Sequence, residues 1–482
     1  MSLNKVYERE LAFQADRRRA TVEFINIVSD LWYDKSIELV LFRNQLINKN
    51  VSDILNLHEY AGAFVQKPIS IFDSVEIIKA IKDLNLPPAK LDIGKLTYEY
   101  HLEDQEYTNA MAFVSDKLND AKDVEAVTPK DVVLYGFGRI GRLVARELMT
   151  KTGKGNQLRL RAIVTRDKIS EEVLAKRASL LMNDSVHGEF AGTVSYSIEK
   201  SALIINDTTV HIISASNPED IDYTKWGISE ALIIDNTGAF RDKEALQRHL
   251  KSKGAAKILL TAPGKGIPNI VHGANHTLFK PEEHHIYSAA SCTTNAITPV
   301  LKAIDESLGI IDGHLETIHA YTNDQNLVDN MHSKYRRGRA ASLNMVITET
   351  GAGKAVAKCL PQLEGKLTSN AIRVPVPNGS LAILHLQVES QTSVEGVNSV
   401  LKKYALEGDL VEQIKFSIDN ELVSSDIIGS SAPAIYDSKA TIVANHGKNI
   451  VLYIWYDNEY GYSHQVIRLA KYIAKVRRYT YY

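Results

Sequence analysis

The sequence predicts three regions of different fold class. A helical N-terminal extension comes first, an α/β region with a doubly wound parallel sheet follows, and an α+β region with a mixed or antiparallel sheet comes last. Glycine is scarce before residue 128, and short apolar runs alternate with helical segments between residues 129 and 291. Since 482 residues are too many for one ordinary domain, we expect domains at 1–127, at 128–291 together with 457–482, and at 292–456.

The N-terminal extension carries helical patterns and no catalytic motif. Leu11–Trp32 places apolar side chains among charges at helical spacing. Ile71–Leu84 is a second predicted helix, with Asp73 or Ser74 as its candidate cap, and Asp104–Leu118 is a third. The role of this extension cannot be inferred from its residues.

The middle region alternates buried strands with helices. It opens with DVVLYGFGRIGRLVARELM, which predicts an apolar strand, a glycine turn and a helix. Further apolar runs predict buried strands at Leu160–Val164, Val210–Ile213, Leu232–Ile234, Lys257–Leu260 and His285–Tyr287. This alternation is typical of a doubly wound α/β sheet.

The last region is richer in strands than in helices. Helices are predicted at Asn295–Leu308 and, at the end of the chain, at Ser463–Arg477. Between them lie strand-like runs at Gly313–Tyr321, Ala371–Val376, Leu381–Glu389, Ala440–Ala444 and Ile450–Tyr456. Long strands with few crossover helices indicate a mixed or antiparallel sheet.

Composition argues against several classes of partner. The chain has 56 basic and 58 acidic side chains, so it offers no excess of positive charge to nucleic acid or to an anionic membrane. The basic triplet Arg17–Arg19 fits a solvated helix face. No run approaches the roughly 18 apolar residues that cross a bilayer, and two cysteines are too few for a disulfide framework. We expect a cytoplasmic protein.

The glycine turn predicts a dinucleotide site. Gly136-Phe137-Gly138-Arg139-Ile140-Gly141 matches G-x-G-x-x-G and lies between a predicted strand and a helix, as in a Rossmann-type fold. In such a turn the first glycine makes the bend, the second admits the pyrophosphate, and the third lets the helix pack on the strand. The helix N-terminus then offers unpaired N–H groups to the phosphates.

The end of the next strand bears on the choice between NAD and NADP. An NAD site normally has an acidic residue here, but this strand ends in Thr165 and Arg166, with Asp167 behind them. A small polar residue followed by arginine suits a 2′-phosphate, because a guanidinium can bind it through two hydrogen bonds. In the alternative interpretation Arg166 points into solvent and Asp167 binds the ribose. The residues favour NADP, or the use of both dinucleotides.

Cys292 is the candidate nucleophile. It lies in SAASCTTN, a turn of small and hydroxyl residues that opens a helix, and a helix N-terminus is expected to lower the pKa of the thiol. Cys359 lies in an apolar helical pattern and fits a buried, inert thiol. A thiol nucleophile needs a base, and His319, in the extended run LETIHAYT, could return beside the helix. The pattern alone does not separate His319 from the other histidines.

Eight short motifs make the chain similar to a known family. GFGRIGR, ASCTTN, IHAYT, RRGRAA, TGAGKAV, RVPVPN, VSSD and WYDNEYGYS occur in this order. Together they closely resemble the phosphorylating glyceraldehyde-3-phosphate dehydrogenase family, in a long form with an N-terminal extension. The resemblance runs from about Asp131 to Val476.

The resemblance implies a covalent mechanism. The Cys292 thiolate would attack the aldehyde of D-glyceraldehyde 3-phosphate, and His319 would take the proton of the thiohemiacetal hydroxyl as hydride leaves for NAD(P)+. The His319 imidazolium would stabilise the thiolate, and the Cys292 backbone N–H would help to bind the oxyanion. Inorganic phosphate would then attack the thioester to give 1,3-bisphosphoglycerate, a reaction of glycolysis and gluconeogenesis. The resemblance implies no metal.

The resemblance also implies binding residues. Thr322 and Arg373, with Arg337 close by, would hold the substrate phosphate. The attacking phosphate would bind at Ser291, Thr293, Thr350 and Gly351. The dinucleotide would contact Gly136, Phe137, Gly138, Arg139, Ile140, Thr165, Arg166, Thr237, Gly238 and Thr261, with Asn458 on the nicotinamide carboxamide and Tyr462 near the ring. A homotetramer is expected on the same ground.

Two departures from the family pattern bear on cofactor choice, and two other functions are the alternatives. Thr165 stands nearest to the family's acidic ribose ligand, and Asn330-Met331 replaces the Leu-Pro typical of NAD-using members, so both favour NADP tolerance. Erythrose-4-phosphate dehydrogenase has similar motifs but hydrolyses its acyl-enzyme, and TGAG with Thr293 favours the phosphate-using enzyme instead. A non-catalytic nucleotide-binding scaffold is a more remote alternative.

Overall fold

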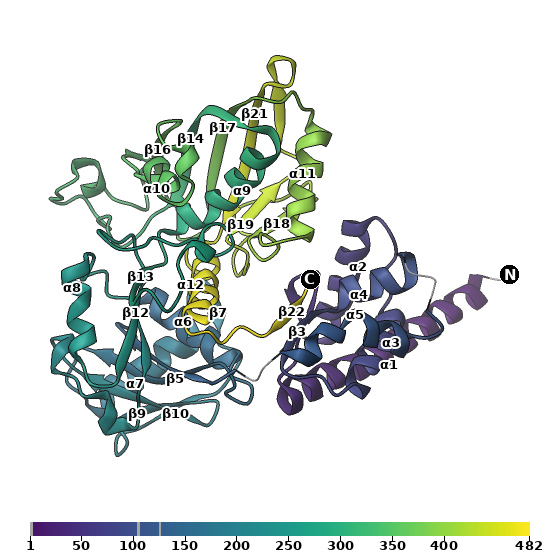
Figure 1. Ribbon diagram of the computed structural model, residues 1–482, viewed down its shortest axis with the longest axis horizontal. Helices are drawn as coiled ribbons and strands as arrows, with labels where there is room; N and C mark the ends of the chain where they lie inside the picture. The colour runs from purple at the N-terminus through teal and green to yellow at the C-terminus, as the bar shows by residue number, and fades with distance from the viewer. Residues whose placement is uncertain (1–2, 104–106, 125–126) are drawn as a thin grey trace. The chain divides into compact units, whose positions relative to one another are not determined.

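The chain folds into two compact units. The computed structural model describes residues 3–103, 107–124 and 127–482. Unit 1 comprises Met1–Thr128, Gly153–Gln157 and Val476–Tyr482, and unit 2 comprises Pro129–Thr152 and Leu158–Lys475. Unit 1 is therefore assembled from three separate stretches of the chain, two of which are the chain's ends (Figure 1).

Unit 1 combines helices with a small sheet that the sequence did not predict. Its α-helices are α1 Leu3–Lys35, α2 Val51–Val65, α3 Ile71–Asp83, α4 Ile93–Tyr98 and α5 Ala110–Lys117. Its sheet has the order β2-β1-β3-β22, formed by β1 Glu38–Leu41, β2 Asn44–Gln45, β3 Ala89–Asp92 and β22 Tyr479–Tyr481. Strands of two to four residues are too short to give a recognisable alternation.

The end of the chain belongs to unit 1 and not, as expected for residues 457–482 as a whole, to the dinucleotide-binding part. β22 pairs in parallel with β3, with Thr480 opposite Lys90. The Arg478 guanidinium lies 5.3 Å from the centre of the Trp32 ring, within cation–π range. The Gln157 side-chain amide donates to the Val476 carbonyl, so all three stretches of unit 1 contact one another.

Two details of the predicted helices of unit 1 need correction. Ser70, and not Asp73 or Ser74, caps α3, because its Oγ accepts a hydrogen bond from the Asp73 backbone N–H at 3.2 Å. Ser74 is instead buried and lies 3.0 Å from Nε2 of His58. Of the helix expected at residues 104–118, the first three residues lie outside the described residues, and α5 begins only at Ala110.

The first sheet of unit 2 confirms the predicted doubly wound fold. Its order is β13-β12-β11-β4-β5-β10-β9-β8, and the six strands from β13 to β10 run parallel. The strands are β4 Lys130–Tyr135, β5 Leu158–Thr165, β8 Val194–Ser197, β9 Ala202–Ile205, β10 Thr208–Ser214, β11 Ala231–Asp235, β12 Ala255–Leu260 and β13 Ile286–Ser288. The winding reverses between β4 and β11, so a crevice is expected at their carboxyl ends.

Helices connect and cover this sheet. After β4 the chain enters α6 Arg139–Thr150, and after β5 it enters α7 Glu171–Met182; the short α8 Lys243–Gln247 follows β11. The central strands β4 and β11 are almost wholly buried, as continuous apolar runs in a two-sided sheet must be.

The second sheet of unit 2 is mixed, as predicted. Its order is β15-β16-β14-β17-β21-β19-β18, with β20 paired to β21. The strands are β14 Ile310–Ala320, β15 Val346–Thr348, β16 Leu367–Val374, β17 Ser380–Val388, β18 Ile414–Ser417, β19 Ala434–Asp437, β20 Ile442–Ala444 and β21 Asn449–Tyr456. β14 runs parallel to β16 and antiparallel to β17.

The four remaining α-helices of unit 2 follow in the chain, and the first three of them contact this sheet. They are α9 Cys292–Leu308, α10 Ala352–Cys359, α11 Val394–Leu406 and α12 Tyr460–Ile473. α12 begins three residues before the predicted start and packs against α6 and α9, which explains why most of its residues are buried. Among the described helices, none combines the length and apolar character that a membrane crossing requires.

Candidate active site

The structure brings Cys292 and His319 together. Cys292 is the first residue of α9, whose N-cap Ser291 accepts a hydrogen bond from the Thr294 backbone N–H at 3.0 Å. His319 lies at the end of β14, which follows α9 directly. The Cys292 Sγ and the His319 Nε2 are 3.6 Å apart, so a proton can pass between them.

The surroundings of His319 indicate which nitrogen is free to act as a base. Nδ1 lies 2.7 Å from the Ala320 carbonyl oxygen, and this distance assigns the ring proton to Nδ1 as the donor. Nε2 then presents its lone pair to the Cys292 thiol. Arg373 Nη1 lies 3.1 Å from the same Nδ1, but it donates to the Ala320 carbonyl at 2.9 Å, since a protonated Nδ1 cannot accept.

Burial is the largest influence on the pKa values of this pair. Burial raises the pKa of the Cys292 thiol above its ordinary value, although the Arg373 charge and hydrogen bonds at Thr293 act in the opposite direction. Burial and Arg373 together lower the pKa of His319 to about 3. The predicted lowering of the thiol pKa is therefore wrong, and near neutral pH the pair is a thiol beside a neutral imidazole.

Arg373 and Thr322 also meet, as the substrate-phosphate site requires. In the parallel register of β14 and β16, His319 lies opposite Arg373. Arg373 Nη1 is 3.4 Å from the Thr322 hydroxyl, and its buried Nε has no hydrogen-bond partner among the described residues. Arg337 donates to Thr348 and to Asp324, yet its charge still helps to lower the pKa of His319 and of Arg373.

The four residues expected around the attacking phosphate make their described hydrogen bonds to other residues, unlike the directly contacting Arg373 and Thr322. The Thr293 hydroxyl lies 3.0 Å from the Tyr456 hydroxyl, and the Ser291 hydroxyl lies 2.7 Å from that of Thr294. The Thr350 hydroxyl accepts from the Ala352 N–H at 3.3 Å. Gly351 precedes α10, and a Cβ placed there would meet nothing within 4 Å. The hydrogen bonds among the described residues do not link Thr350 and Gly351 to Ser291 and Thr293.

The glycine turn has the geometry that a dinucleotide needs. Gly136 follows β4 with φ +96°, a conformation that favours glycine. A Cβ on Gly141 would lie 2.5 Å from the Gly136 carbonyl oxygen, so the third glycine permits the contact between helix and strand. A Cβ on Gly138 would meet nothing within 4 Å, and α6 begins there without a side-chain cap. Phe137 in this turn is buried, whereas Ile140 is half-buried.

The residues beyond β5 fit a dinucleotide with an unusual ribose contact. Thr165 is buried at the end of β5, and its Oγ1 has no hydrogen-bond partner among the described residues. Asp167 is paired with Arg177, while Arg166 is exposed. An unpartnered hydroxyl at the carboxyl end of a strand suits a ribose, so the residues present fit the bound group.

Other predicted cofactor residues use their side chains within the protein. The Thr237 hydroxyl donates to Asp235 at 2.7 Å, and the Thr261 hydroxyl donates to the Asp235 carbonyl at 3.0 Å. Gly238 has φ +66°. The Arg139 guanidinium binds Asp184 and Glu459, so its expected part in cofactor binding rests on its backbone N–H.

Hydrogen bonds to other parts of the chain hold the side chains of Asn458 and Tyr462 in place. The Ser380 hydroxyl donates to Asn458 Oδ1 at 2.9 Å and accepts from the Ala320 N–H at 3.1 Å. Asn458 therefore keeps its amide Nδ2 as the group available to a ligand. The Tyr462 hydroxyl donates to the Ala290 carbonyl at 2.8 Å, in the turn just before Cys292.

Sequence reasoning missed Ser380 and Tyr456. The Tyr456 hydroxyl contacts Thr293, and its ring meets that of His319 edge-on, with centroids 6.0 Å apart. Tyr456 stands in the WYDNE motif, which could have drawn attention to it. Ser380 gives no such signal, because a serine that opens a strand resembles any turn residue. In the described part of the chain no group of His, Cys, Asp and Glu is suited to a metal ion.

The first prediction concerns the reactivity of the thiol. In a Cys359→Ser background, whose hydroxyl can replace the Sγ contact to the Asn269 carbonyl, Cys292 is the only thiol. We expect the rate of its alkylation by iodoacetamide to rise with pH, with a midpoint above the ordinary thiol pKa of about 8.5. The reason is that only the thiolate reacts and burial raises the pKa of Cys292. The rate constant against pH measures this. A midpoint near neutral pH would contradict it.

The second prediction uses two glycines of one turn as a matched pair. Gly141→Ala should lower the free energy of unfolding by about 1–3 kcal/mol, because the new methyl group meets backbone. Gly138→Ala should leave stability unchanged, since its Cβ has open space and its φ of −78° suits alanine, yet weaken dinucleotide binding at least about tenfold. Urea unfolding and calorimetric titration separate the two effects. Equal stability of both variants would contradict the assigned packing.

Comparisons with known proteins agree with this geometry. The model of the NAD-binding domain of glyceraldehyde 3-phosphate dehydrogenase matches residues 130–243, and that of its C-terminal domain matches residues 291–458. A glyceraldehyde-3-phosphate dehydrogenase-like protein of Pseudomonas aeruginosa is 47% identical over 462 residues, which cover 94% of this chain and 98% of the relative. Glyceraldehyde-3-phosphate dehydrogenases of Streptomyces coelicolor and Thermotoga maritima are 38% and 41% identical; the matches cover 71% and 72% of this chain and 98% and 99% of theirs.

Proposed function

The chain belongs to the glyceraldehyde-3-phosphate dehydrogenase family, and on this premise we propose that it is the phosphorylating enzyme. It would oxidise D-glyceraldehyde 3-phosphate with NAD(P)+ and inorganic phosphate to 1,3-bisphosphoglycerate. Membership of the family makes it an oxidoreductase that acts on an aldehyde, with an NAD-binding domain. The observation that carries the proposal is the Cys292 Sγ, 3.6 Å from the His319 Nε2 and beside Arg373.

In the first step the thiol adds to the aldehyde. The Cys292 Sγ forms a bond to the carbonyl carbon, its proton passes to His319 Nε2 and then to the new alkoxide, and His319 is neutral again. The Arg373 charge, which lowers the pKa of Cys292, stabilises negative charge on Sγ during the attack. The Cys292 backbone N–H at the start of α9 is the second donor for the developing oxyanion.

In the second step the thiohemiacetal is oxidised. Nicotinamide, when bound, supplies the hydride acceptor. His319 Nε2 takes the hydroxyl proton as the C–H electron pair leaves, so the thiohemiacetal becomes a thioester. Asn458, held through Oδ1 by Ser380, orients the carboxamide with its free Nδ2. Tyr462, anchored on Ala290, supports the cysteine turn from behind.

In the third step phosphate releases the product. A phosphate oxygen attacks the thioester carbon, the C–S bond breaks, and the His319 imidazolium returns its proton to Sγ. Arg373 and Thr322, with Arg337 nearby, would hold the substrate phosphate. Gly351, which has open space around it at the start of α10, together with Thr350, Ser291 and Thr293 would receive the attacking phosphate.

The cofactor is NADP, or either dinucleotide. Asp167 is paired with Arg177, while Thr165 offers a hydroxyl that has no partner among the described residues. Arg166 is exposed at the same strand end, where it could reach a 2′-phosphate.

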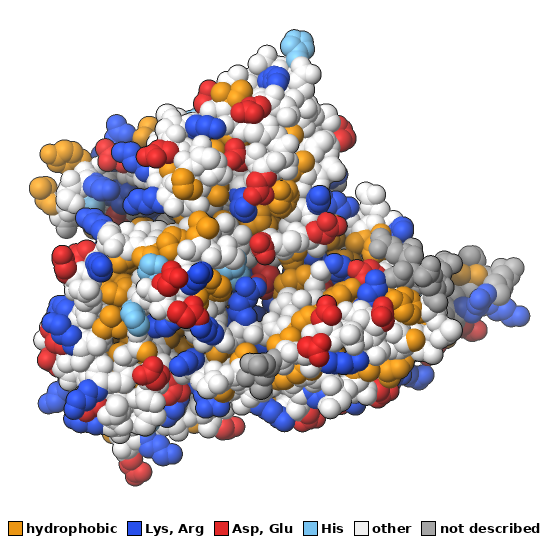
Figure 2. Space-filling model, in the orientation of Figure 1, with side chains coloured by type: hydrophobic (Ala, Val, Ile, Leu, Met, Phe, Trp, Pro, Cys, Tyr) orange, Lys and Arg blue, Asp and Glu red, His pale blue; other side chains and the backbone are white. Residues whose placement is uncertain are grey.

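The assembly is a homotetramer by family resemblance, and the surface of the chain supports association. Between β14 and β16, the segment 327–347 exposes several large apolar side chains to solvent, as a surface that binds another protein would. They are Leu327, Val328, Met331, Tyr335, Leu343, Met345 and Ile347. Figure 2 shows apolar side chains projecting at the upper left, at this part of unit 2. A further copy of the chain would cover them.

The third prediction tests the reaction itself. With D-glyceraldehyde 3-phosphate and either dinucleotide, removal of phosphate should slow NAD(P)H formation by roughly a hundredfold, because a bound nucleophile is lost. Arsenate should restore the rate. Cys292→Ser should abolish turnover and leave cofactor binding unchanged. A rate indifferent to phosphate and arsenate would instead assign the hydrolytic reaction of erythrose-4-phosphate dehydrogenase, and Cys292-independent turnover would overturn the mechanism.

The fourth prediction tests cofactor choice. Arg166→Ala should raise the Kd for NADP+ about tenfold and leave that for NAD+ unchanged, since it removes one charge-assisted hydrogen bond to the 2′-phosphate. Lys168→Ala, a neighbouring exposed cation, is the matched control and should alter neither. Equal losses for both dinucleotides in the Arg166 variant would mean that this side chain does not meet the 2′-phosphate.

A further inference from the structure

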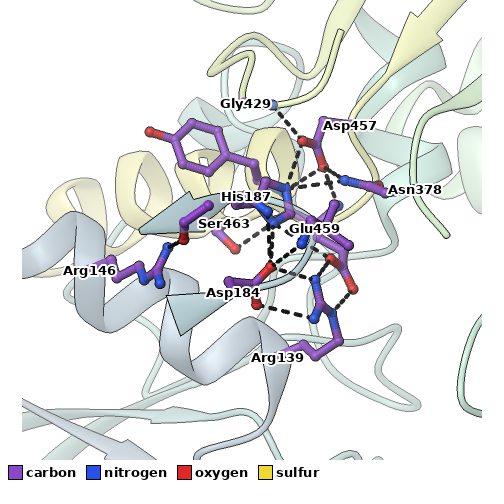
Figure 3. Close-up of polar contacts among 12 residues, drawn as sticks. Arg139, Arg146, Asp184, His187, Asn378, Gly429, Asp457, Glu459 and Ser463 are labelled. Atoms are coloured by element: carbon purple, nitrogen blue, oxygen red, sulfur yellow. Dashed lines mark hydrogen bonds and ion pairs between the residues drawn. The ribbon is translucent and has the colours of Figure 1, made fainter. Parts of the chain in front are cut away.

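A buried network of charged groups surrounds the turn that carries Asn458. Figure 3 shows Arg139 from α6, His187 and Asp184 from the hairpin of β6 Asn183–Asp184 and β7 Gly188–Glu189, and Asp457 and Glu459 from the turn before α12. Arg139 binds both Asp184 and Glu459. The mechanism proposed above uses none of these side chains, although Asn458 lies between two of them in the chain.

Asp457 is the centre of this network. It is 1% exposed and lies within hydrogen-bond distance of five groups: the His187 Nε2 at 2.9 Å, the Asn378 Nδ2 at 2.8 Å, and the backbone N–H groups of Gly429, Glu459 and Tyr460 at 2.9, 2.9 and 2.8 Å. The last two belong to the two residues after Asn458, so the Asp457 carboxylate fixes the backbone that follows the residue that would meet nicotinamide.

His187 faces carboxylates at both ring nitrogens. Nε2 is 2.9 Å from Asp457 Oδ2, whereas Nδ1 is 3.4 Å from Asp184 Oδ1 and 3.9 Å from Glu459 Oε2. A neutral imidazole has one N–H and would turn a lone pair toward one of these carboxylates. The Arg139 guanidinium binds Asp184 and Glu459, and the charges of Arg142 and Arg146 on the same helix also act on Asp184. The geometry therefore favours the imidazolium, which supplies a donor to each side.

The other contacts of His187 hold its ring in place. The Tyr460 ring stacks on it, with centroids 5.7 Å apart and an interplanar angle of 26°. The backbone N–H of His187 donates to Asp184 at 3.0 Å. Asn378 Nδ2 lies 3.1 Å from His187 Nε2, and both groups point at Asp457. The side chain is 3% exposed, so water does not replace these partners.

We propose that His187 is a positioning residue for the nicotinamide end of the cofactor, and that it acts by holding the Asp457 carboxylate that fixes the turn bearing Asn458. The inference rests on the proposed function, because it requires that Asn458 meets nicotinamide. It also joins the two ends of the cofactor site, since Arg139 of the glycine turn binds Glu459 in the same network.

The proposal makes cofactor affinity depend on pH. Burial alone lowers the pKa of His187, but the hydrogen bond and charge of Asp457, with the charges of Glu459 and Asp184, raise it above its ordinary value. The imidazolium is therefore fully present below the ordinary histidine pKa, and it is lost as the pH rises through the raised value. Its loss lowers the fraction of molecules with an ordered turn, and the apparent Kd rises in proportion.

The test is calorimetric titration of the full chain with NAD+ from about pH 6 to about pH 9. NAD+ is the probe because the 2′-phosphate of NADP+ would itself titrate near neutral pH. We expect the wild-type Kd to rise about three- to tenfold across this range. His187→Gln, which keeps a donor to Asp457 but no charge, should show the wild-type high-pH Kd at every pH. His314→Gln, a histidine bonded to Thr368 and Asn370 on β14, is the matched control and should follow the wild type.

Asp184→Asn gives a second readout that survives if His187→Gln does not fold. It removes a negative charge near Nδ1 and should move the midpoint of the Kd profile to lower pH. An unmoved midpoint, or a His187→Gln profile that coincides with the wild type, would overturn the inference and leave the proposed reaction untouched. A wild-type chain that binds no dinucleotide would overturn both. The phosphate dependence of the reaction remains a separate test of the proposed function.

Discussion

The pairing of β14 with β16 is the constraint on which the candidate site depends. It sets His319 beside Arg373, and because β14 follows α9, the same strand fixes His319 against Cys292. A slip of one residue would turn His319 to the other face of the sheet. On its other side β14 pairs with β17, which brings the Ser380 hydroxyl to the backbone of Ala320 and to Asn458. One strand register thus aligns the three residues proposed as the base, the anion-binding arginine and the nicotinamide contact.

Burial is the largest influence on the pKa values of Cys292 and His319, which this strand register brings together. It holds the thiol protonated and the imidazole neutral, so the proposed proton transfer starts between two uncharged partners. Arg373 is the cation in contact with the pair, and its own burial lowers its pKa. A charge that appears on Sγ during attack is therefore met by a guanidinium in poorly solvated surroundings, where the attraction is stronger than in water. The raised pKa of Cys292 is the opposite of what its place at a helix N-terminus predicted.

Local features could be predicted from the sequence, and features made by distant segments could not. The glycine turn and the strands of the parallel sheet follow from short-range patterns, and the positive φ of Gly136 agrees with them. Cys292 and His319 were singled out by motif, but the pKa of the thiol depends on packing that no motif encodes. His187 and Asp457 are far apart in the chain, and their contact exists only in the folded protein. The sheet of unit 1 escaped prediction for the same reason.

That sheet has a consequence for the order in which the protein can be completed. β3 has β1 on one side, and its other side is filled by β22, within the last seven residues of the chain. During synthesis the helices of unit 1 leave the ribosome before unit 2, while β3 keeps an open edge until β22 has been made. Open edges invite pairing with other chains. Unit 1 thus emerges before unit 2 but closes only after it, and a chain that ended before β22 would carry the unpaired edge permanently.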